Sequence, residues 1–212
     1  EISMWGLFPW GGFGATMLPD RLTRLYKQLE GKAQGCFLYS EGIYEDFNKA
    51  VESQFYLLNK TDWKETARAY AHYELGIKDV QSYIRLVTLI EKTHTDVATT
   101  GICDLANSDE AYRIAQMIDK ELPEWSRRRW QWRLIYLRCE IDARRYRIPA
   151  ENREENIKIG NEHGRITSTD WETLMADDDV LQADFQELIR LFHCSPTKTD
   201  DPYHHRVRPL CK

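Results

Sequence analysis

Three carboxylates lie close together in the segment "YSEGIYEDF", residues 39–47. They are Glu41, Glu45 and Asp46, and they follow "AQGCFLYS", an apolar run with the length of a buried parallel strand. Two carboxylates can cleave a glycosidic bond when one protonates the leaving oxygen and the other acts as nucleophile or base. We take Glu41, one residue from the predicted strand end, as the catalytic candidate. No partner carboxylate is evident in residues 1–40.

Helix capping is the alternative interpretation of the same segment. Ser40 is a good N-cap residue, and negative charge in a first helical turn is favoured by roughly 0.3 to 1 kcal/mol. Capping is the simpler explanation for Glu45 and Asp46 in particular. Because loops at the carboxyl ends of parallel strands form binding sites, Tyr39, Ser40, Glu45 and Asp46 are also candidates for substrate contact.

A second candidate lies upstream, in the aromatic loop "WGLFPWGGFG" at residues 5–14. Trp5 and Trp10, with Phe8 and Phe13 between glycines, can form a flat floor on which the apolar faces of sugar rings stack. The alternative is an aromatic plug that packs beneath the helical part. The glycine spacing in "WGGFGA" does not match a dinucleotide-binding fingerprint.

The elements that position these residues follow from the order of apolar patterns. A strand, a loop and a helix over residues 20–30 are followed by a second strand, loop and helix, which is the alternation of an α/β sheet or barrel. The later pattern is helical, and the predicted helices span residues 43–58, 62–75, 78–94, 107–121, 123–146, 150–163 and 178–193. The predicted fold class is mainly α, a helical bundle-like array preceded by one or two βα units, the incomplete end of an α/β barrel. We divide the chain into barrel-like units (residues 1–60), a helical domain (61–195) and an extended or disordered tail (196–212).

Composition narrows the choice of ligands and partners. The net charge of −5 gives no overall basic field, so attraction to nucleic acid or to an anionic membrane is not expected. Eight arginines in residues 127–147 alternate with aromatics, but Trp130, Leu134, Leu137 and Ile141 form an apolar helical stripe that favours a scaffold over a nucleic-acid site. The six histidines and five cysteines show no metal-ligand spacing, so we expect neither a metal nor a cofactor.

Three segments carry a resemblance to a known class of protein. They are "FPWGGFG…LPDRL", "GCFLYSEGIYEDFNKAVESQFY" and "WQWRLIYLRCEIDARRYR", and the most specific part is "YSEGIYEDFNK", Tyr39 to Lys49. They resemble segments of large bacterial glycoside-hydrolase-like proteins from glycan-degrading loci, in which a (β/α)₈-like barrel precedes an all-helical C-terminal region. The similarity covers roughly residues 4–147.

The resemblance implies that residues 1–60 are the last βα units of a barrel and that Glu41 lies at its substrate-facing rim. The earlier units are absent from this chain, so we expect the chain by itself to be inactive. The implied partners are a carbohydrate and the remainder of a larger polypeptide, with a periplasmic or extracellular location. A stand-alone helical protein-interaction module, which could be cytoplasmic, is the alternative from another class.

Overall fold

The computed structural model of the chain describes residues 15–33, 36, 43–100, 105–145 and 179–192. The chain divides into two compact units, residues 1–148 and 149–212. The regular structure of the described residues is helical, and they contain no strand. The prediction of a mainly α fold is therefore confirmed, whereas nearly all of the two predicted strands of the βα units, and the tail at 196–212, lie outside the described residues.

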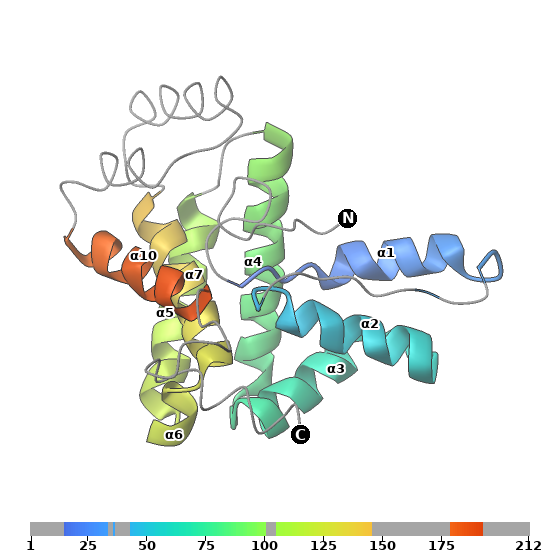
Figure 1. Cartoon of the computed structure of the whole chain (residues 1–212), viewed down its shortest axis with the longest axis horizontal. Helices are drawn as coiled ribbons and strands as arrows, with labels where there is room; N and C mark the ends of the chain where they lie inside the picture. The colour runs from blue at the N-terminus through green and yellow to red at the C-terminus, as the bar shows by residue number, and fades with distance from the viewer. Residues whose placement is uncertain (1–14, 34–35, 37–42, 101–104, 146–178, 193–212) are drawn as a thin grey trace. The chain divides into compact units, whose positions relative to one another are not determined.

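The first unit contains the helices α1 to α7 (Figure 1). Helix α4 lies between a group formed by α1, α2 and α3 and the helices α5 and α7 (Figure 1). Their bounds are α1 Pro19–Leu29, α2 Asp46–Leu58, α3 Trp63–Ala69, a π-helix η1 Tyr70–Glu74, α4 Val80–Thr100, α5 Leu105–Glu121, α6 Glu124–Arg127 and α7 Trp130–Arg145. The second unit contains α10, Asp179–Phe192.

Helices α1 and α2 are joined by an aromatic contact. Pro19 is suited to the first turn of α1, where its missing N–H leaves no bond unmade. Tyr26 of α1 packs against Phe55 and Tyr56 of α2, with ring centroids 5.3 and 5.2 Å away. Asn59, in the left-handed region at φ 53°, ends α2, and its Oδ1 accepts the Tyr26 hydroxyl at 2.7 Å. The described part of residues 1–60 therefore includes two helices that pack against each other.

The predicted single helix at 123–146 is wrong, because the chain turns between α6 and α7. The turn brings Arg129 to the end of η1, where its guanidinium donates to the Glu74 carbonyl at 2.5 Å. Ser126 donates its hydroxyl to the Leu75 carbonyl. These donors satisfy carbonyls that the end of a helix leaves without intrahelical partners.

The end of η1 also needs Gly76. Its φ of +67° disfavours any residue with a side chain, and a Cβ built there would lie 3.2 Å from the Trp125 ring. The predicted helix at 62–75 is thus correct in extent, but its last turn is a π-turn in which the Leu75 N–H donates to the Tyr70 carbonyl at 3.2 Å.

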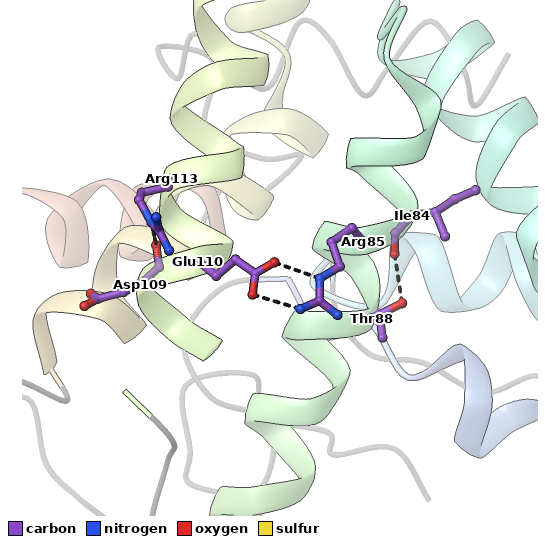
Figure 2. A network of polar contacts seen from close by, with 6 residues as sticks. All are labelled: Ile84, Arg85, Thr88, Asp109, Glu110 and Arg113. Carbon is purple, nitrogen blue, oxygen red and sulfur yellow. Dashed lines mark hydrogen bonds and ion pairs between the residues drawn. The ribbon is translucent and has the colours of Figure 1, made fainter. Parts of the chain in front are cut away.

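Helices α4 and α5 carry an ion pair on their surface (Figure 2). Both Nε and Nη2 of Arg85 donate to the Glu110 carboxylate at 2.8 Å, which is the bidentate geometry that favours Arg over Lys. This pair raises the pKa of Arg85 and lowers that of Glu110. Since both side chains are exposed, such a pair contributes about 0.2–1 kcal/mol at most.

A carboxylate from α4 caps the first turn of α1. The Glu91 oxygens accept the backbone N–H groups of Asp20 and Arg21 at 2.9 and 2.8 Å, across about 70 residues of sequence. Leu18, the residue before α1, offers no side-chain cap of its own. Burial raises the pKa of Glu91, while the two N–H donors oppose that rise.

We therefore expect Glu91→Ala to lower the free energy of unfolding by about 2 kcal/mol, because two N–H groups lose a charged acceptor. Urea denaturation measures this change. Asp62→Ala is the matched control, since Asp62 caps α3 through one exposed bond to the Lys64 N–H at 3.0 Å. An effect of Glu91→Ala no larger than that of the control would contradict the cross-helix cap.

Candidate functional site

The sequence-predicted site falls into two parts. Five of its residues lie outside the described residues: Trp5, Trp10, Tyr39, Ser40 and Glu41. Glu45 and Asp46 are described, and both lie at the start of α2. The described part of the site therefore consists of the start of α2 and of the residues that directly follow the two undescribed segments.

The two candidate segments lead into the described structure at one junction. The aromatic loop leads into Ala15, and the segment with Glu41 leads into Ile43. The Thr16 N–H donates to the Tyr44 carbonyl at 2.8 Å, and both residues are buried. The residues that directly follow the two candidate segments are thus held side by side.

Further contacts from two helices fix residues 15–18, the first segment of this junction. The four residues 15–18 are all buried. The Ala15 N–H donates to the Leu134 carbonyl of α7 at 3.3 Å, and the Leu18 N–H donates to Asn48 Oδ1 of α2 at 2.8 Å. The residues that directly follow the aromatic loop are therefore held by both α2 and α7.

Glu45 lies inside the unit and not on its surface. Its exposed fraction is 4%, and its side chain does not cap α2. Its charge adds to desolvation in raising the pKa of Glu52, which lies on the same helix. Burial favours a structural role for Glu45, and contact with a substrate stays a prediction.

Asp46 is a partly desolvated carboxylate with one strong donor. The hydroxyl of Tyr70, the first residue of η1, donates to Asp46 Oδ2 at 2.6 Å. Burial raises the pKa of Asp46, and Glu74 adds to the rise, whereas the Tyr70 hydroxyl, Lys49 and Arg129 lower it. Asp46 is therefore suited to taking up a proton, and its role in binding a substrate stays a prediction.

Tyr70, which donates to the Asp46 carboxylate, belongs to a cluster of aromatic rings. Tyr70 and Tyr83 are stacked at 13° with centroids 6.5 Å apart, and Phe47 packs edge-on against both. Burial raises the pKa of both tyrosines well above the ordinary value, and the Asp46 charge adds to the effect. The Tyr83 hydroxyl is buried and has no hydrogen-bond partner among the described residues. These hydroxyls stay protonated near neutral pH.

Sequence reasoning missed several residues that shape this region, and two of them left a detectable signal. Asn48 stands in the first turns of α2, where Asn is a poor helix former, and it binds the Leu18 N–H. Glu91 follows Leu89 and Ile90 in an apolar run, at a position that the helical period places on the buried face with Ile84 and Val87. A polar residue on a buried helical face predicts a specific partner. No pattern pointed to the pairing of Tyr70 with Asp46.

The arginine-rich segment is organised by carboxylates. Within the described residues, ion pairs join Arg127 to Asp119, Arg128 to Glu124, Arg129 to Glu74, Arg138 to Asp142 and Arg144 to Glu140. Leu134, Leu137 and Ile141 of the predicted apolar stripe are buried, and so is Trp132. Arg138 is buried, and the carboxylate of Asp142, one turn later, neutralises its charge. These contacts favour the scaffold interpretation.

A metal site and a membrane span each require a recognisable arrangement of residues. Within the described part of the chain, no group of three or more His, Cys, Asp or Glu side chains is arranged to hold a metal ion. None of the described helices combines the length and the apolar character that a membrane span requires. Comparisons with family models, with curated proteins and with solved structures gave no match to this chain.

Proposed function

We propose that this chain is the helical C-terminal part of a carbohydrate-processing, glycoside-hydrolase-like protein and contributes part of its sugar-binding rim. One observation carries the proposal, the hydrogen bond from Thr16 to Tyr44 at 2.8 Å within a buried junction. It holds side by side the two points from which the aromatic loop and the segment with Glu41 depart. Stacking residues and a carboxylate on two neighbouring segments are what a sugar subsite requires.

In this proposal each candidate residue has a separate task. Trp5, Trp10 and Tyr39 stack on the faces of sugar rings, and Ser40 contributes a hydroxyl to the same rim. Glu41 acts as one of the two carboxylates of glycoside hydrolysis. The second carboxylate and the earlier units of an α/β barrel come from the remainder of a larger polypeptide. Residues 1–60, with α1 and α2 as their helices, form the last βα units of that barrel. This chain by itself then binds a sugar without hydrolysing it.

Tryptophan fluorescence during titration with oligosaccharides tests the proposal. We use gluco-, xylo-, manno- and galacto-oligosaccharides as probes, and we expect saturable binding of at least one. Trp10→Ala should weaken that binding about tenfold, a loss of roughly 1.4 kcal/mol. Trp125→Ala is the matched control, because Trp125 is also an exposed indole, 56% accessible, but lies on α6.

Equal affinity of the wild-type chain and Trp10→Ala would remove the stacking platform from the proposal. A wild-type chain that binds none of the four probes would contradict it altogether. Hydrolysis of an aryl glycoside by the isolated chain, lost in Glu41→Gln, would contradict the requirement for a second carboxylate from elsewhere.

A protein-interaction module is the second candidate, and an exposed apolar surface favours it. Leu25 and Leu29 of α1 are 42% and 45% accessible, and Leu57 and Leu58 of α2 are 79% and 56% accessible. Apolar side chains that stay exposed on adjoining helices are a feature of docking surfaces. This candidate predicts that Leu57→Lys disrupts a complex or an oligomer seen by light scattering, with no effect of any oligosaccharide.

A further inference from the structure

Residues 15–18 enter the first unit without regular secondary structure of their own, although all four are at most 5% exposed. A buried main chain needs partners for its N–H and C=O groups. The described partners of the N–H groups here lie on other parts of the unit, as the Tyr44 carbonyl does for the Thr16 N–H. Residues 15–22, which we call the docking segment, are therefore held in the way that a protein holds a bound peptide.

Three buried side chains from three helices bind the main chain of the docking segment. Asn48 of α2 accepts the Leu18 N–H at 2.8 Å, and Arg138 of α7 donates to the Ala15 carbonyl at 3.4 Å. Glu91 of α4 accepts two N–H groups at the start of α1, at 2.9 and 2.8 Å. These three side chains are only 1%, 1% and 6% exposed. Because polar groups are costly to bury without hydrogen bonds, α2, α4 and α7 are built to receive a main chain at this place.

The side chains of the docking segment are recognised as well. Met17, Leu18 and Leu22 are apolar anchors with exposed fractions of 0%, 2% and 4%. Asp20 supplies a polar contact, because its Oδ1 accepts the indole N–H of Trp63 on α3 at 2.7 Å. Main-chain bonds give a bound peptide its affinity, and buried side chains give it specificity. The helices therefore select a sequence and not only an extended main chain.

The chain that follows the docking segment passes over an exposed turn. Residues 30–33, directly after α1, are all exposed. Gly31 has a φ of +72°, and a Cβ built on it would meet no atom within 4 Å. The chain can therefore be cut at this turn without removing any side chain that binds the docking segment.

We propose that the helical body, residues 43–100 and 105–145, is a peptide-binding site whose ligand is the docking segment. The chain supplies this ligand in cis, and a second copy supplies it in trans once the connection after α1 is cut. A tethered ligand acts at an effective concentration on the order of millimolar, so the uncut chain keeps its own segment bound against competitors. The site is separate from the sugar-binding rim and does not depend on it.

A protease cleavage site inserted after Gly31 in the full chain tests the proposal. After cleavage, residues 1–31 should stay bound during size-exclusion chromatography, and the helical circular dichroism should be unchanged. The probe is a fluorescent peptide of residues 15–30, which stands for the segment of a second copy. Its N-terminus is acetylated, so that the Ala15 N–H remains an amide donor. Fluorescence anisotropy should show saturable exchange into the cleaved chain and none into the uncut chain.

Variant peptides test specificity without altering the protein. Asp20→Ala should weaken binding about tenfold, because the Trp63 indole loses its carboxylate acceptor. Met17→Asp should abolish binding, because the Met17 side chain is fully buried and a carboxylate there would be desolvated.

Variants of the helical body test the main-chain contacts. Glu91→Ala should weaken binding of the wild-type peptide at least about tenfold, because two N–H groups lose a charged acceptor. Asp79→Ala is the matched control, since Asp79 is exposed and its described hydrogen bonds go to Ser82 at the start of α4. Asp79→Ala should leave the affinity unchanged.

Three results would overturn the proposal. They are unfolding of the helical body on cleavage, release of residues 1–31 without any binding of the peptide, and equal binding of the wild-type and Met17→Asp peptides.

Discussion

Arg138→Ala is expected to lower the free energy of unfolding by about 3–5 kcal/mol, because it leaves the Asp142 charge buried without its cation. The two side chains are only 2% and 5% exposed, and Nε and Oδ2 are 2.5 Å apart. Asp142 Oδ1 already lacks a hydrogen-bond partner among the described residues, so no group that the structure describes there replaces the guanidinium. Arg138 also donates to the Ala15 carbonyl at 3.4 Å, so its loss loosens the chain at the junction. Chemical denaturation with fluorescence detection measures the change.

The control for this prediction is a pair with the same spacing on the surface. Arg128 and Glu124 are also four residues apart, but their side chains are 68% and 74% exposed. Arg128→Ala should therefore cost less than about 1 kcal/mol. Replacing both partners of the buried pair, as in Arg138→Met with Asp142→Leu, should restore much of the stability. Equal effects of Arg138→Ala and Arg128→Ala would show that burial does not set the strength of the pair.

Trp132→Ala should destabilise the first unit by about 3–5 kcal/mol, because it empties the space of the largest fully buried side chain among the described residues. The indole lies on α7 and touches the ring of Tyr136, with centroids 6.4 Å apart. Its N–H donates to Asp119 Oδ1 of α5 at 2.8 Å. The substitution therefore removes both apolar packing and a hydrogen bond to a carboxylate. The midpoint of thermal unfolding should fall accordingly.

Trp132→Phe separates these two contributions. It keeps an aromatic ring but cannot donate to Asp119, so we expect a smaller loss than that of Trp132→Ala. Trp130, half-buried at the start of the same helix, provides a second comparison, and its replacement by Ala should cost less. A loss in Trp132→Ala no greater than that in Trp130→Ala would contradict the placement of Trp132 in the core.

Much of the helical framework could be predicted from the sequence because its signals are local. Apolar periodicity placed the predicted helix at 43–58 over α2 and the one at 107–121 over α5. The break between α6 and α7 could not be predicted in this way, because its cause is the distant contact of Arg129 and Ser126 with the end of η1. Helix propensity does not register such contacts.

The candidate site was less predictable than the framework. The acidic character of "YSEGIYED" indicated either capping or chemistry, and local pattern does not tell the two apart. The burial of Glu45 and the bond from Tyr70 to Asp46 arise from packing of α2 against η1 and α4, across some 25 residues or more of sequence. Glu41 and the aromatic loop lie outside the described residues, so their roles rest on the proposal.

The most direct test of the proposed function follows all seven tryptophan indole N–H signals by NMR while an oligosaccharide is added. Assignment uses single Trp→Phe variants. The account predicts that the signals of Trp5 and Trp10 shift in a saturable way, while those of Trp125 and Trp132 stay in place because these residues belong to the helical scaffold. No shift in Trp5 or Trp10, or shifts confined to the scaffold tryptophans, would contradict a sugar-binding rim formed by the aromatic loop.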